Sequence, residues 1–86
     1  MITYDGTKPL SEFCKGIVKT GNVAIIYVKS SYKTDITGFP LGDGCYVTTY
    51  KSATPGYAIY YAITNKGARY YCVEDGGNFS KWETIK

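Results

Sequence analysis

Three tyrosine-rich segments of this chain alternate with a period of two residues. They are "CYVTTY" (45–50), "YAIYYAIT" (57–64) and "ARYYCVE" (68–74), and the short segments "SATPG" and "NKG" separate them. Alternation of this kind is typical of β-strands, and turns as short as these join neighbouring strands as hairpins. The pattern therefore predicts a meander of antiparallel strands.

The same alternation divides the side chains of each strand between two faces of a sheet. The odd-numbered face of the second segment carries Tyr57, Ile59, Tyr61 and Ile63, and the even-numbered face carries Ala58, Tyr60 and Ala62. An ordinary one-sided sheet has one apolar and one polar face, whereas neither face is polar here. A helix can cover only one of them, so we expect the other to be a partner interface or a ligand surface. Tyr46, Tyr50 and Tyr60 are the interface candidates.

The remaining segments predict one helix and two further strands. Leu10, Phe13, Cys14 and Ile17 follow helical spacing in "TKPLSEFCKGIVKTG". "NVAIIYVK" is a continuous apolar run, which favours a central strand covered on both faces, and "KWETI" predicts a short last strand. The expected fold class is α+β, mainly β. A short N-terminal helix precedes an antiparallel meander of about five strands, in a single domain over residues 1–86.

The longest segment without a period is "SSYKTDITGFPLGDG". Its density of Ser, Gly, Pro and Asp predicts a loop long enough to have a role of its own. Tyr32, Lys33 and Asp35 supply an aromatic ring with flanking charges, which is the minimum that a glycan site needs. We therefore expect residues 30–43 to contact a receptor, with Trp82 supporting them from beneath.

Residue types that are absent or poorly spaced exclude several kinds of chemistry. The sequence has no histidine, so it lacks the usual base of a Ser or Cys nucleophile, and we expect neither an enzyme nor a cofactor. Cys14, Cys45 and Cys72 are odd in number and far apart, which predicts buried thiols rather than disulfides or a zinc site. "GDG" and "EDGGN" do not provide the ligand series of a calcium loop, so we expect no metal.

Size, charge and hydropathy limit the kinds of partner that this chain is expected to bind. A domain of 86 residues is marginal in stability, and without disulfides or a metal the expected help is oligomerisation. No apolar run is long enough to span a bilayer, so no membrane insertion is expected. The net charge of +3 comes with scattered lysines, which gives little support to a nucleic-acid partner.

The order of the segments forms a further pattern. A helix-like entry leads to a strand opened by "GN", then to "D…GFPLGDG", to tyrosine-rich strands joined by "NKG" and followed by "RYY", and to the ending "GGNFSKW". From Asp5 to Ile85, this order resembles the knob-like domain of bacteriophage tail fibres and of the related pyocin fibres. The matching positions are Asp35, Phe39, Pro40, Gly44, Arg69, Tyr71, Gly76, Gly77, Ser80 and Trp82. Phe79 departs from the family, which often has a tryptophan there.

The resemblance implies a homotrimeric module at the C-terminal end of a longer fibre, which helps attach a phage particle to the bacterial surface. Such a module belongs to the virion tail fibre and is made in the cytoplasm of the bacterial host. Its receptor would be a surface polysaccharide or teichoic acid. The glycan-binding candidates are Tyr32, Lys33, Asp35, Arg69, Tyr71 and Trp82.

The sequence leaves three functions open. The first is the receptor-binding module, and the second is a structural knob that trimerises and caps a fibre without binding a ligand. The third is a single-stranded nucleic-acid binder, which ranks last because the chain has no RNP-like motif and no basic groove. Two residues have alternative roles as well: Trp82 as a core ring or a sugar-stacking ring, and Arg69 as an interface cation or a contact to an anionic glycan.

Overall fold

The computed structural model of the chain describes residues 1–17, 19–29 and 44–86. Within these residues it contains one helix and seven strands. The helix is α1 (Leu10–Ile17), and the strands are β1 (Ile2–Thr3), β2 (Val23–Val28), β3 (Cys45–Lys51), β4 (Tyr57–Thr64), β5 (Arg69–Asp75), β6 (Asn78–Phe79) and β7 (Glu83–Thr84). The mainly β fold with a short N-terminal helix is as predicted.

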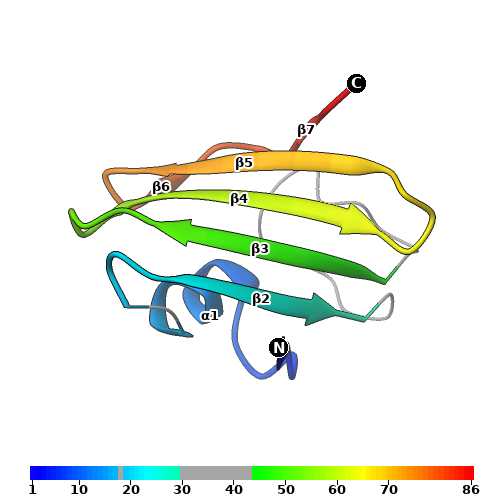
Figure 1. Ribbon diagram of the computed structural model, residues 1–86. Coiled ribbons are helices and arrows are strands. Elements are labelled where there is room, and N and C mark those ends of the chain that lie inside the picture. Colours follow the sequence, from blue (N-terminus) through cyan, green and yellow to red (C-terminus); the bar gives the residue numbers. More distant parts are fainter. Residues whose placement is uncertain (18, 30–43) are drawn as a thin grey trace.

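All the strands belong to one sheet. Its order is β1-β2-β3-β4-β5-β6, and β7 also pairs with β5 (Figure 1). From β2 to β5 the neighbours are antiparallel, as the hairpin pattern predicted. The sheet is nevertheless mixed, because β1 pairs with β2 in parallel. The chain passes through α1 between these two strands, and a connection of that length allows parallel pairing.

The predicted tight turn between β4 and β5 is confirmed. Gly67 has a φ of 89° and donates its N–H to the carbonyl oxygen of Thr64 at 2.9 Å. A positive φ of this size suits glycine and strains other residues. This turn fixes the β4–β5 register, in which Tyr61 lies opposite Tyr71.

Helix α1 packs on one face of the sheet, beside β2 (Figure 1). Leu10 and Cys14 are buried on its inner side, as the helical spacing predicted, and Phe13 is partly buried against the same cluster. The buried hydrophobic cluster is Tyr4, Leu10, Cys14, Ile26, Val28, Cys45, Val47, Ala58, Tyr60, Ala62, Cys72 and Trp82. All the core strand positions therefore lie on the face that α1 covers.

One prediction for β2 is wrong. The apolar run "VAIIYV" was expected to be covered on both faces, but Val23 is 57% exposed and Ile25 is 47% exposed. Only Ile26 and Val28 are fully buried in this strand. A continuous apolar run shows that both faces avoid polar groups, but it does not show that both are covered within one chain.

Candidate functional site: an open sheet face and a buried polar cluster

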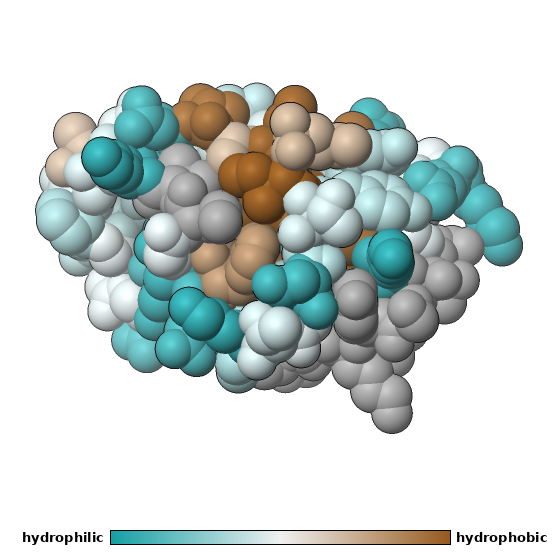
Figure 2. Space-filling model, turned by 90° about the horizontal axis from the view of Figure 1, so that it is seen from below, coloured by the Kyte–Doolittle hydropathy of each residue, from teal (hydrophilic) through white to brown (hydrophobic). Residues whose placement is uncertain are grey.

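The face of the sheet opposite α1 is covered by no described element and is strongly hydrophobic. Nine large apolar side chains lie on it with between 38% and 57% of their surface exposed. They are Val23, Ile25, Tyr46, Tyr50, Tyr57, Ile59, Tyr61, Ile63 and Tyr71. We call this surface the open face. Figure 2 looks at the molecule along the edge of the sheet, from below Figure 1, and hydrophobic side chains gather there in its upper and central parts.

Strand register arranges these side chains in rows across the sheet. One row runs through Ile25, Thr48, Tyr61 and Tyr71, and the next contains Val23, Tyr50, Ile59 and Val73. Tyrosine rings contact each other between rows: the Tyr50 and Tyr61 ring centroids are 5.9 Å apart at an interplanar angle of 82°. Such edge-to-face packing restricts the rings, so less side-chain entropy is lost when a partner covers them.

The charged side chains of the open face lie at its margin. On the open-face positions of β2 to β5, the charged side chains are Arg69 and Asp75, at the two ends of β5. Glu83, in β7, lies beside Tyr71 on the same side. On β2 to β5, the interior of the face therefore has no charged side chain.

A hollow of about 390 Å³ opens at one end of this face. It is lined by the apolar side chains of Tyr50, Tyr57, Ile59 and Val73, together with Asp75. The remaining lining residues are Lys51, Ser52, Ala58 and Glu74. This hollow is large enough to receive a side chain from a partner.

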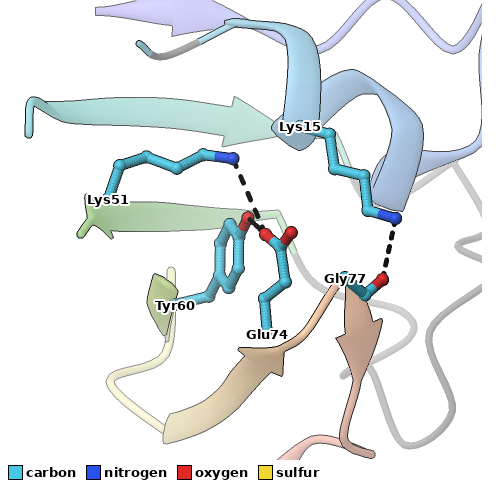
Figure 3. A network of polar contacts seen from close by, with 5 residues as sticks. All are labelled: Lys15, Lys51, Tyr60, Glu74 and Gly77. Carbon is cyan, nitrogen blue, oxygen red and sulfur yellow. Dashed lines mark hydrogen bonds and ion pairs between the residues drawn. The ribbon is translucent and has the colours of Figure 1, made fainter. Parts of the chain in front are cut away.

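A buried polar cluster lies on the opposite, helix-covered face (Figure 3). The Tyr60 hydroxyl donates a hydrogen bond of 2.8 Å to Oε1 of Glu74, and the Lys51 Nζ lies 3.6 Å from the same oxygen. The side chains of Lys51 and Glu74 are only 9% and 3% exposed. Ala58 lies between them in the register, and its small side chain leaves the space that they occupy. Two partners on one oxygen thus compensate the burial of the carboxylate.

Burial governs the protonation of Tyr60 and of the neighbouring buried thiols. Burial, followed by the hydrogen bond to Glu74 and the charge of Glu74, raises the pKa of the Tyr60 phenol far above its usual value. Burial also raises the pKa of the Cys45 thiol to about 11 and that of Cys72 to about 12, with smaller contributions to Cys72 from Cys14 and Glu74. These groups stay protonated at neutral pH, so none of them is an activated nucleophile or base.

A second hollow, of about 460 Å³, lies beside the end of α1 and is lined by Lys15, Lys19 and Lys51 among others. Two of these cations already have partners. The Lys15 Nζ donates to the carbonyl oxygen of Gly77 at 2.8 Å and lies 5.5 Å from the centroid of the Phe79 ring, while Lys51 pairs with Glu74 (Figure 3). The hollow is therefore a weak anion site.

Four of the predicted site residues lie together on the open face. These are Tyr46, Tyr50, Arg69 and Tyr71, and all four are exposed. Tyr32, Lys33 and Asp35 lie outside the described residues. The structure thus brings two of the three interface candidates and two glycan candidates onto one surface.

Two predicted assignments are wrong. Tyr60 was expected at an interface with Tyr46 and Tyr50, but it is fully buried on the other face, where α1 covers it. Trp82 is 5% exposed and belongs to the core, so its ring cannot stack on a sugar from this position. The favoured expectation for Trp82, that of a core ring, is confirmed.

The residues that complete the open face were not named as candidates. Tyr57, Ile59, Tyr61 and Ile63 form its central strand. The alternation in "YAIYYAIT" had already placed these four together, and the small Ala58 and Ala62 on the other side could have identified the face that a helix approaches. The sequence therefore contained the signal for this surface.

The described residues contain no group of three or more Cys, Asp and Glu side chains that could hold a metal ion. No helix among them is long and apolar enough to cross a membrane. The three cysteines are buried thiols, as predicted.

Comparisons of the chain with protein-family models, with curated proteins and with solved structures find no match. The resemblance to tail-fibre knobs therefore stays a prediction that depends on the sequence motifs.

Proposed function

We propose that this chain is a non-enzymatic association module whose open face packs against another copy of the same chain. The observation that supports this most directly is the exposure of nine large apolar side chains on one surface. With about 200 Å² for a whole tyrosine and somewhat less for isoleucine and valine, the exposed area of these nine side chains is on the order of 700 Å². The largest apolar patch of an ordinary monomer is about 300–600 Å², whereas a stable interface buries about 800 Å² per partner.

The composition of the open face favours a protein partner over a sugar or a nucleic acid. Ile25, Ile59 and Ile63 stand among the tyrosines, and aliphatic side chains offer neither the flat ring nor the hydrogen bonds that a sugar requires. Single-stranded nucleic acid requires cations along its path, and Arg69 is the one cation on the open-face positions of β2 to β5. A hydrophobic protein surface matches the face best.

Within the tail-fibre resemblance, self-association corresponds to the structural knob. A second proposal is that the chain binds a glycan of the bacterial surface. The residues proposed to contact it are Tyr32, Lys33 and Asp35, and the remaining candidates are Arg69 and Tyr71. Tyr32→Ala should weaken binding to host cells without altering folding. Normal cell binding by this variant would remove the receptor role from the segment with Tyr32, Lys33 and Asp35.

Size-exclusion chromatography with light scattering tests the association. The wild-type mass should rise above the 9.5 kDa of one chain as the concentration increases. Ile59→Lys places a charge at the centre of the open face and should keep the chain monomeric. Thr20→Lys adds the same charge at an exposed turn outside the face and should leave association unchanged. Equal behaviour of the two variants would contradict the proposal.

A further inference from the structure

The open-face side chains of β4 and β5 follow a self-complementary order. Along β4 they are Tyr57, Ile59, Tyr61 and Ile63, and along β5 they are Arg69, Tyr71, Val73 and Asp75. The register places Tyr57 opposite Asp75, Ile59 opposite Val73, Tyr61 opposite Tyr71 and Ile63 opposite Arg69. These eight positions form four rows across two strands.

When a second copy of β4 and β5 is laid over the first with both strand directions reversed, each open-face residue lies over a different residue of the same strand. Each tyrosine of β4 then falls on the position of an isoleucine, and Tyr71 falls on the position of Val73. At the ends of β5, Arg69 falls on the position of Asp75. The reversed face is therefore complementary to the original in both size and charge.

We infer that two copies of the chain pack open face to open face about a two-fold axis that runs across the strands. This inference rests on the proposed self-association and adds its geometry. The axis lies between the rows of Ile59 and Tyr61, so β4 lies over the partner's β4 with the opposite direction. Such an interface is isologous, since each contact occurs twice. Two sheets stacked in this way form a sandwich with layers about 10 Å apart.

Charge specifies this orientation. Arg69 of one copy meets the partner's Asp75, and Asp75 meets the partner's Arg69. An axis along the strands would instead place β5 over the partner's β2, whose open-face residues Val23, Ile25 and Tyr27 have no charge to pair with. Complementary charges at the margin of an apolar interface determine register more than affinity.

Shape supports the same orientation. Under the two-fold axis, Ile63 of one copy lies over the partner's Tyr57, beside the hollow of about 390 Å³ that Tyr50, Tyr57 and Ile59 line. Ile63 is 48% exposed in the single chain. Ile63 thus packs against the rim of this hollow and excludes water from it, as in the well-packed pockets of interface hot spots. The symmetric interface contains two such contacts.

A charge-exchange experiment tests the orientation with two variants, Arg69→Asp and Asp75→Arg. Each variant alone places like charges against each other twice, so its dimer dissociation constant should rise by about tenfold or more. An equimolar mixture should form a heterodimer at wild-type affinity, because opposite charges then meet at both contacts between the two variants. Native mass spectrometry distinguishes the heterodimer from the homodimers. The double variant carrying both substitutions should dimerise alone, like the wild type.

The outcomes separate this inference from the proposed function. A wild-type chain that stays monomeric at every concentration overturns both. A wild-type mass of three chains, as the tail-fibre resemblance implies, keeps the association and overturns the two-fold geometry. A dimer whose two charge variants associate no better in a mixture than alone keeps the dimer and overturns this orientation.

Discussion

The Tyr60 hydroxyl and the Glu74 carboxylate form a buried hydrogen bond of 2.8 Å beneath the helix, although they lie 14 residues apart in the chain. The Lys51 ammonium lies 3.6 Å from the same carboxylate oxygen. This contact joins β3, β4 and β5 on the covered side of the sheet. None of these three side chains lies on the open face.

Removing one partner of the buried ion pair should destabilise the fold more than removing both. Lys51→Met leaves the Glu74 carboxylate with a single partner, and breaking a buried pair typically costs about 3–5 kcal/mol. The double substitution Lys51→Met with Glu74→Leu should still cost less than Lys51→Met alone, because no charge stays buried and the remaining cost is the Tyr60 hydroxyl without its acceptor. Urea denaturation of the two single variants and the double variant gives the coupling free energy between Lys51 and Glu74. Additive costs would show that the pair is effectively solvated.

Replacing Trp82 should affect the core and not the association. Trp82→Ala should lower the free energy of unfolding by about 3–5 kcal/mol, since its side chain is 5% exposed. Thermal melting measures this loss, and Trp82→Phe should recover part of it. At a temperature where the alanine variant is folded, its dimerisation should match the wild type. Lost association in a folded Trp82→Ala chain would place the ring at an interface.

Stability should decrease at alkaline pH. Burial raises the pKa of Cys45 to about 11 and of Cys72 to about 12, from 9.0. The folded state therefore holds these protons more tightly than the unfolded state. The contribution of the two thiols to the free energy of unfolding is complete below pH 9 and is lost as the pH rises toward their pKa values in the folded state. Between pH 9, where half of the unfolded thiols are ionised, and pH 10, each thiol should lower the free energy of unfolding by about 1 kcal/mol. The buried Tyr60 phenol shifts in the same direction, and its effect begins above pH 10.

Urea denaturation at a series of pH values checks this effect. Cys72→Ala should remove roughly half of the decrease between pH 9 and 10, since two similar thiols share it. A stability that stays level to pH 11 would mean that solvent reaches both thiols in the folded state.

The cysteines should be insensitive to redox conditions and slow to react. All three are buried thiols, and a protonated buried thiol is a poor nucleophile. A thiol reagent such as DTNB should label the native chain only at the rate of unfolding, and reductant should leave the melting temperature unchanged. Fast labelling before unfolding would contradict the burial of Cys14, Cys45 and Cys72.

The sequence predicted the strands and their two faces because both follow from local spacing. It did not predict which face α1 covers, since the apolar stripe of a short helix fits either face equally well. Tyr60 was misassigned for this reason, and the small Ala58 and Ala62 beside it were the available clue. Strand β1 has only two residues and shows no period, so its parallel pairing was not predictable. The contact between Lys51 and Glu74 depends on the register of three strands, which no local pattern specifies.

Concentration-dependent chemical modification of the tyrosines tests the central claim most directly. Tyr57 and Tyr61 are exposed in the single chain, whereas Tyr4 and Tyr60 are buried and serve as internal controls. With tetranitromethane and peptide mass spectrometry, Tyr57 and Tyr61 should react readily in dilute solution and lose reactivity as the concentration rises. Tyr4 and Tyr60 should stay unreactive throughout. If the mass of the particle increases while Tyr57 and Tyr61 keep their full reactivity, association uses another surface and the account is contradicted.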